Sequence, residues 1–112
     1  MSDGPEYTTG SGNVYRDLGF PDADELKVKA ELAMEIGRII EDRDLTQVQA
    51  AEILGVDQPK VSALVRGRLD GFSLERLYRF LNSLGRDIQI TLRDKPADRR
   101  AASVSVVREV RR

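Results

Sequence analysis

Residues 45–67 constrain the fold more than any other part of the chain, because they have the pattern of two short helices joined by a turn. Thr46 is a favourable N-cap for the first helix, and Gln49 stands three residues later, where it completes a capping box. Asp57 is a favourable N-cap for the second helix. Pro59 falls in the first turn of that helix, where a missing N–H costs little. Both helix starts are therefore predicted from local sequence alone.

Apolar residues give each of these two helices an inner side. The first helix carries residues suited to a close helix crossing, namely Ala50, Ala51, Ile53 and Leu54. After a turn at Gly55-Val56, the second helix has an inner stripe at i, i+3, i+4 spacing, formed by Val61, Leu64 and Val65. Its outer side consists of Gln58, Pro59, Lys60, Ser62, Ala63 and Arg66. Two capped helices around a glycine turn, the second with a polar outer side, predict a helix-turn-helix motif.

A long helix is predicted before this motif. It begins at Asp22 or Asp24 and continues to about Glu41. One face carries Leu26, Ala30, Ala33, Gly37 and Ile40, widened by Leu32, Ile36 and Ile39. The outer side is acidic, with Glu25, Glu31, Glu35, Glu41 and Asp42. This acidic side is a solvated face or, alternatively, a docking surface for a basic protein.

Another helix is predicted after the motif, capped by Ser73 and ended by Gly85. Its buried stripe is predicted to be Leu74, Leu77, Tyr78, Leu81 and Leu84. Arg76 and Arg79 lie off this stripe, and we expect them either to contact phosphate or to form salt bridges with the acidic helix. The predicted fold class is all-α, a bundle of about four to five helices with one C-terminal β-strand.

The strand is predicted at residues 87–93, where Ile88, Ile90 and Leu92 alternate with polar residues. A lone strand is unstable because its backbone N–H and C=O groups need partners. The region around Val14 and residues 104–107 are short candidates within the chain. Pairing with the same strand of a second copy about a two-fold axis is favoured, which predicts a homodimer.

The remaining segments set the expected domain limits. Residues 1–12 are rich in Gly, Ser, Thr and Asp and are expected to be a flexible tail. The helix-turn-helix domain is expected at residues 13–95, followed by a basic C-terminal tail at 96–112. That tail is disordered, forms a second strand or acts as a basic arm, and the pattern does not select among these.

Charge is distributed unevenly although the net charge is only −1. Residues 1–57 hold 5 basic and 13 acidic side chains, whereas residues 58–100 hold 10 basic and 5 acidic side chains. This asymmetry suggests a polyanion on one side and another partner on the other, the alternative being a solubilised surface with chance segregation. With no histidine and no cysteine, neither a thiolate metal site nor the usual general base is available. An enzyme is therefore not favoured, no cofactor or metal is expected, and a cytoplasmic protein without a membrane segment is expected.

The outer side of the second motif helix suits double-stranded DNA. Gln58 and Lys60 can read adenine and guanine edges, while Ala63 can contact a thymine methyl. The full candidate set for DNA contact is Gln47, Gln58, Pro59, Lys60, Ser62, Ala63, Arg66 and Arg68. Other roles are open: Gln58 as a cap, Ser62 bonded to its own helix, Ala63 packed against a neighbour, and Arg66 paired with Asp70 or Glu75.

The run Leu45-Thr46-Gln47, Ala50-Ala51, Leu54-Gly55-Val56, Gln58, Val61-Ser62 and Arg66-Gly67 resembles the lambda-repressor-like (XRE/Cro) helix-turn-helix family. The flanks Asn13-Val14-Tyr15, Asp17-Leu18-Gly19, Gly71-Phe72-Ser73 and Leu84-Gly85-Arg86-Asp87-Ile88 are similar to its HigA-like antitoxin branch. The resemblance covers roughly residues 13–93 and implies that Gln47 and Gln58 approach DNA. The chain differs from many members of the family at Asp57, where they carry serine or threonine.

The resemblance implies a repressor that binds a palindromic operator as a dimer and acts as the antitoxin of a small basic toxin protein. An orphan regulator without a toxin, and a protein-interaction module that has kept the fold without DNA, are the alternatives.

Overall fold

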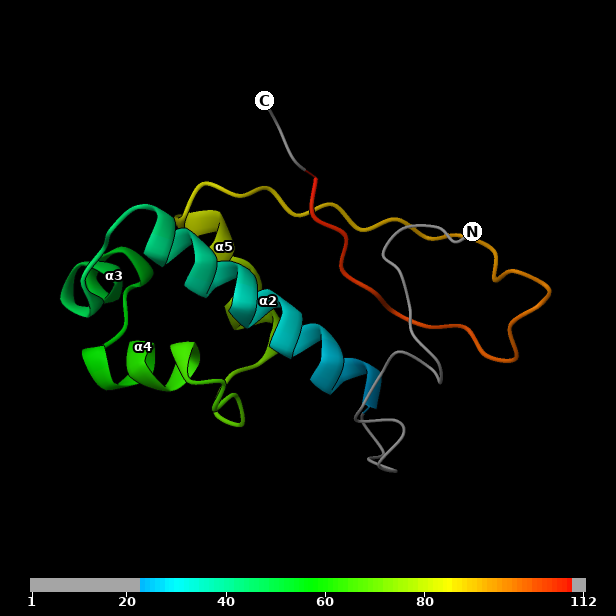
Figure 1. The fold of residues 1–112 in the computed structure, drawn as a ribbon, viewed down its shortest axis with the longest axis horizontal. Coiled ribbons are helices and arrows are strands. Elements are labelled where there is room, and N and C mark those ends of the chain that lie inside the picture. Colours follow the sequence, from blue (N-terminus) through cyan, green and yellow to red (C-terminus); the bar gives the residue numbers. More distant parts are fainter. Residues whose placement is uncertain (1–22, 110–112) are drawn as a thin grey trace. The chain divides into compact units, whose positions relative to one another are not determined.

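Side-chain caps determine where three helices of this protein begin. The computed structural model describes residues 23–109, and these contain four helices: α2 (Ala23–Asp42), α3 (Gln47–Leu54), α4 (Gln58–Val65) and α5 (Leu74–Ser83) (Figure 1). The side-chain oxygens of Thr46, Asp57 and Ser73 accept the N3 backbone N–H of α3, α4 and α5 at 3.1, 3.2 and 3.2 Å. These three caps were predicted and are confirmed, as is the all-helical class for the described part of the chain.

Each helix is followed by a residue with a left-handed backbone conformation. After α5, Gly85 has a φ of +85°, and its N–H donates to Asn82 O at 3.0 Å while Arg86 N–H donates to Leu81 O at 2.9 Å. This pair of bonds is a Schellman motif, for which glycine is favoured because it has no Cβ. The same pattern after α2 has the non-glycine Asp44 in the left-handed position, at a φ of +55°.

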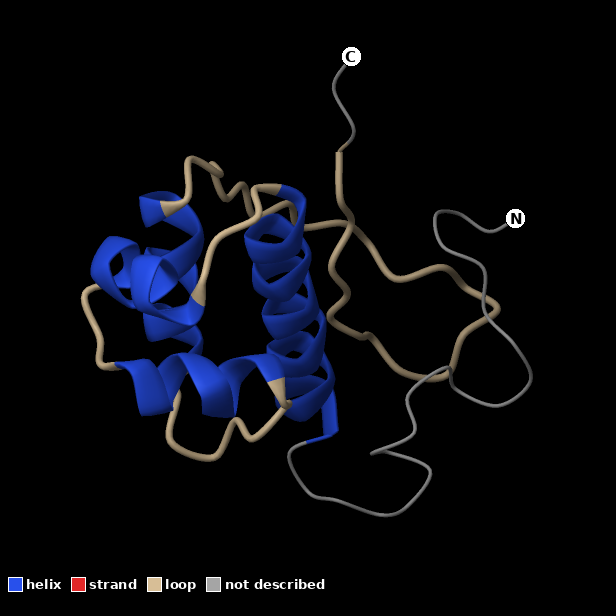
Figure 2. Ribbon diagram, turned by 60° about the vertical axis from the view of Figure 1, so that its left-hand side comes forward, coloured by secondary structure: helices blue, strands red, loops and turns tan. Residues whose placement is uncertain are grey.

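Residues 29–92 form one unit with a shared apolar core. Within this unit α3 contacts both α4 and α5, and the three short helices lie on one side of α2 (Figure 2). The most completely buried large side chains are Ile36, Leu64, Leu77, Leu84 and Val61. Because each of α2, α4 and α5 supplies at least one of them, truncating any one should cost about 2–5 kcal/mol of stability.

Four expectations about the core need correction. Ile53 was predicted on the inner side of α3 but is 39% exposed, because α3 packs through Ala50, Ala51 and Leu54. Val65 was predicted on the inner stripe of α4 but is 42% exposed, because it is the last residue of the helix, whereas Val61 and Leu64 before it are buried. On α5 the buried set contains Phe80, whereas Leu74 and Tyr78 are half-buried. On α2 the buried side chains include Leu32, Ile36 and Ile39, whereas Leu26, Ala30 and Gly37 are only half-buried.

The second unit contributes residues 23–28 and 93–109 to the described part of the chain. Residues 95–103 form a hydrogen-bonded turn, in which Lys95 Nζ donates to Arg99 O at 2.6 Å and Arg99 Nη1 donates to Ser103 Oγ at 2.8 Å. No strand occurs between residues 93 and 109. The predicted tail at 1–12, the Val14 region and Asp22 lie outside the described residues.

Candidate nucleic-acid interface

The start of α3 places Gln47 at the positive end of a helix. Thr46 Oγ1 accepts the N–H of Gln49, and the Gln49 side chain accepts the N–H of Thr46 at 2.8 Å, so the predicted capping box is present. Gln47 is the first helical residue and is half-buried. The helix dipole at this end favours an anion such as a phosphate oxygen.

Only three residues separate α3 from α4. Gly55 adopts a φ of +74°, and its N–H and that of Val56 both donate to Ala51 O, at 2.8 and 3.1 Å. Asp57 then caps α4, so Gln58 is the first helical residue and not the cap. Backbone hydrogen bonds hold the start of this linker, and the Asp57 carboxylate caps the helix at its end. The linker therefore fixes the direction in which α4 leaves α3.

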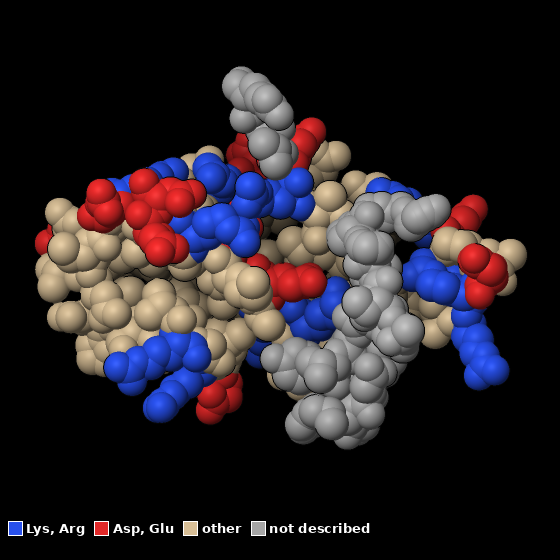
Figure 3. All heavy atoms as spheres, viewed as in Figure 1, with Lys and Arg blue, Asp and Glu red and all other residues tan. Residues whose placement is uncertain are grey.

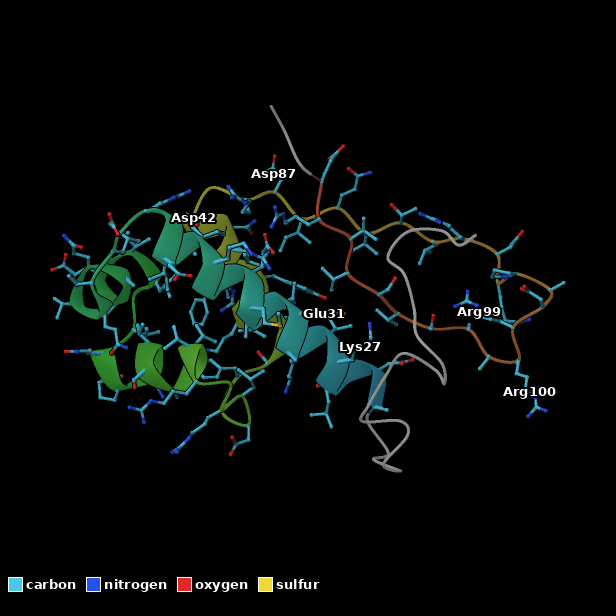
Figure 4. The ribbon with its side chains drawn as sticks, viewed as in Figure 1. Lys27, Glu31, Asp42, Asp87, Arg99 and Arg100 are labelled. Carbon is cyan, nitrogen blue, oxygen red and sulfur yellow. The ribbon has the colours of Figure 1, made fainter. Side chains whose placement is uncertain are left out.

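The outer side of α4 is exposed along its first turn. Gln58, Pro59 and Lys60 are exposed, whereas Val61 and Leu64 are 0% and 1% exposed. Ser62 and Ala63 are half-buried, and Arg66 is exposed at the C-cap position. Figure 4 shows side chains of α4 and of the turn after it projecting away from α2. One face of α4 is thus committed to the core and the other to solvent.

Arg68 is held next to this outer side. Its N–H donates to Ala63 O at 2.9 Å, as the second bond of a Schellman motif around Gly67, whose φ is +79°. Arg68 and part of α4 line a hollow of about 340 Å³, whose other lining residues are Asp57, Pro59, Lys60, Ala63, Asp70, Gly71 and Phe72. Of the predicted contact residues, Pro59, Lys60, Ala63 and Arg68 are brought together here, while Gln47 lies on a different helix.

Charge of both signs surrounds the hollow. Lys60 and Arg68 are exposed cations, and Asp57 and Asp70 are exposed anions. Figure 3 shows basic side chains along the edge of the unit formed by α4 and the turn after it, with acidic and basic side chains over the C-terminal end of α2. Asp42 stands at that end of α2 in Figure 4.

A helix-turn-helix domain family model matches residues 14–93. One solved structure, named provisionally as an XRE family transcriptional regulator, is 47% identical with a TM-score of 0.76, covering 80% of this chain and all of that one. The chain belongs to the XRE helix-turn-helix family. No curated protein matches this XRE-family chain. In the described part of the chain, no helix combines the length and apolarity needed to cross a membrane.

The dimerisation residues predicted for this XRE-family chain lie in an irregular segment. The strand predicted at residues 87–93 is not seen. Ile88 is half-buried, while Ile90 and Leu92 are 71% and 91% exposed. The physical reason is that a strand needs a second strand for its N–H and C=O groups, and the described residues of one chain do not supply it.

Sequence reasoning missed the part that Arg76 plays in this XRE-family chain. Arg76 was expected to contact phosphate or to pair with acidic residues of α2. Instead its Nη1 donates to Gly71 O at 3.3 Å, and its guanidinium lies over the rings of Phe72 and Phe80. The sequence signal was Phe80 four residues after Arg76, on its own side of α5, together with Phe72 directly before the Ser73 cap, where a hydrophobic staple folds back onto the first turn.

Proposed function

We propose that this protein is a sequence-specific DNA-binding transcriptional repressor that reads the major groove with α4. The observation that carries the proposal is the division of α4: Val61 and Leu64 are fully buried, while Gln58 and Lys60 at its start are exposed. A helix held by its inner side presents its outer side in a fixed orientation. Such a helix fits the major groove, where every base pair has a distinct set of donors, acceptors and methyl groups.

Different residues would carry specificity and positioning. Gln58 can bond adenine through two hydrogen bonds, Lys60 can bond guanine, and Ala63 can contact a thymine methyl group. The remaining candidates, Gln47, Pro59, Ser62, Arg66 and Arg68, would lie along the same groove or its phosphates. Arg68 and the dipole at the start of α3 suit phosphate oxygens.

A second copy would supply the affinity that one helix lacks. Ile90 and Leu92 are exposed on alternate positions of residues 87–93, and the backbone of that segment forms no strand within the described chain. We propose that two copies pair these segments about a two-fold axis, with Ile88, Ile90 and Leu92 on the shared face. Two reading helices about 34 Å apart would then match the half-sites of a palindromic operator.

The biological setting that fits best is an antitoxin that represses its own operon and binds a small basic toxin protein. The resemblance of the motif flanks and the excess of acidic residues in residues 1–57 support this setting. An orphan regulator of the same family is the closest alternative. A small basic open reading frame beside the gene, and its co-purification with this protein, would distinguish the two.

A mobility-shift titration against DNA from the promoter of its own gene tests the repressor proposal. Binding should weaken strongly between about 50 and 200 mM salt, because cations released from phosphates drive association. An unrelated duplex of equal length measures non-specific binding in the same conditions. Failure to shift the promoter more strongly than that duplex would contradict the proposal. It would favour a protein-interaction module on the same fold, the alternative suggested by the negative charge of Asp57 beside the proposed phosphate contacts.

A further inference from the structure

Arg76 joins α5 to the turn that precedes it. Its Nη1 donates a 3.3 Å hydrogen bond to Gly71 O, and its Cζ lies 5.2 Å from the centre of the Phe72 ring and 5.6 Å from that of Phe80. Both rings are buried, and they meet edge to face with centroids 6.0 Å apart. A guanidinium over aromatic rings is attracted by their negative faces, so Arg76 holds one backbone carbonyl and two core rings at once.

The turn held in this way links α4 to α5 (Figure 1). Its first residue, Arg68, is bonded to α4 through Ala63 O, and its last, Phe72, donates to Leu69 O at 3.0 Å. Asp70 and Gly71 between them are exposed. The turn is therefore anchored to α4 at its start and to α5 at its end, and the second anchor includes Arg76.

Across the hollow beside α4, this turn faces the residues proposed to meet DNA. Lys60 and Ala63 line the hollow from α4, and Arg68 and Gly71 line it from the turn. A shift of the turn would therefore change where the Arg68 cation stands relative to Lys60. The guanine edge proposed for Lys60 and the phosphate proposed for Arg68 have a fixed separation in the duplex, so the two cations serve them together only when their own separation is also fixed.

We propose that Arg76 is a positioning residue for DNA binding, acting through Arg68. It does not contact DNA in this view, because its guanidinium is engaged with Gly71 and the two rings. The inference rests on the proposed DNA-binding function. It adds to that function the residue that holds the turn after α4 in a fixed position beside α4.

The test is a double-mutant cycle on promoter DNA with Arg68→Ala, Arg76→Lys and the two combined. Arg76→Lys keeps the charge but removes the planar group, and Arg79→Lys is the matched control on the exposed side of the same helix. Arg76→Lys should weaken binding about three- to tenfold and lower the salt slope by about one, as Arg68→Ala does. The double variant should bind like Arg68→Ala alone, and Arg79→Lys like wild type.

Amide hydrogen exchange without DNA separates positioning from a general loss of stability. In Arg76→Lys the N–H of Phe72 should exchange faster, while the amides of α2 between residues 32 and 40 remain as in wild type. Arg76→Met retains an unbranched apolar side chain over the rings but cannot donate to Gly71 O, so it should give the same pattern. Exchange at Phe72 as slow as in wild type would overturn the inference.

The outcomes are distinguishable. If wild-type protein does not select its promoter, the proposed function falls and this inference falls with it. If wild-type protein binds and the losses from Arg68→Ala and Arg76→Lys multiply, only the inference falls. Uniformly faster exchange in α2 as well as at Phe72 would also overturn it, because Arg76 would then be a general stabilising residue.

Discussion

Arg43 Nη2 donates a 2.7 Å hydrogen bond to the backbone carbonyl of Leu84. Arg43 follows the C-terminus of α2, and Leu84 is the C-cap of α5, so the bond ties together the ends of two helices that are 41 residues apart in sequence. The guanidinium charge also lies at the negative end of the α5 dipole. This contact is therefore both a tertiary link and a helix cap.

Removing that link should lower the stability of the helical unit. We expect Arg43→Ala to reduce the free energy of unfolding by about 1–2 kcal/mol, because a charge-assisted bond to a carbonyl with few other partners is lost. Urea denaturation at one fixed protein concentration measures it. The matched control is Arg38→Ala, which removes an ion pair between an exposed arginine and the half-buried Glu35 and should cost less than about 1 kcal/mol. Equal effects of the two variants would contradict the capping role.

Asp44 should be replaceable by glycine with a gain in stability. Its φ of +55° is a left-handed conformation that costs an L-residue about 1–2 kcal/mol, whereas glycine loses about 0.5–1 kcal/mol through its more flexible unfolded chain. We therefore expect Asp44→Gly to stabilise the protein by about 0.5 kcal/mol and Asp44→Val to destabilise it. Thermal unfolding of the three proteins checks the order, and a Val variant as stable as wild type would show that this conformation is not strained.

The reading residues of α4 should be separable from its stability. We expect Gln58→Ala combined with Lys60→Ala to abolish preference for promoter DNA while the circular dichroism spectrum and melting temperature stay near wild type, since both side chains are exposed. Arg79→Ala, which also removes an exposed cation, serves as the control and should keep the preference. Unfolding of the double variant would place those side chains in the core instead.

Substitution of Asp57 by serine should strengthen DNA binding, in contrast to the substitutions of Gln58 and Lys60. Asp57→Ser keeps an oxygen that can cap α4 but removes a negative charge beside the proposed phosphate contacts. We expect promoter binding to tighten about two- to threefold at low salt, and the gain to shrink as salt screens the charge. Asp57→Ala should instead cost about 1 kcal/mol of stability through the lost cap. If the serine variant bound more weakly, the carboxylate would have a direct role in recognition.

The proposed dimer can be tested at a single exposed position. Ile90→Lys places a charge on the shared apolar face, and we expect monomers by multi-angle light scattering at concentrations where wild type is dimeric. Thr91→Lys is the matched control, because alternate residues of a strand point to opposite faces, and it should remain dimeric. A mass unchanged by Ile90→Lys would remove residues 87–93 from the interface.

Local interactions were the predictable part of this structure. The capping oxygens of Thr46, Asp57 and Ser73 act within three residues of themselves, so their roles could be inferred from sequence spacing. The position of Val61 and Leu64 on the inner side of α4 follows in the same way from the 3.6-residue period.

Interactions between distant residues were not predictable. Val65 has the right spacing for the core but is exposed, since spacing says which side of a helix a residue occupies and not how far the neighbouring helix extends. Arg43 gave no sign of its bond to Leu84, because the two meet only once α2 and α5 have packed. The strand at 87–93 was read from alternation alone, and alternation cannot supply the neighbouring backbone that a strand requires.

The three-residue connection from Gly55 to Asp57 has a consequence for how such proteins can diversify. Because α4 is anchored by its linker and its inward residues, substitutions among its outward residues should leave the scaffold intact, each changing stability by less than about 0.5 kcal/mol. A new target sequence can then be acquired by substituting outward residues of this eight-residue helix, while Val61 and Leu64 keep it in place on the core.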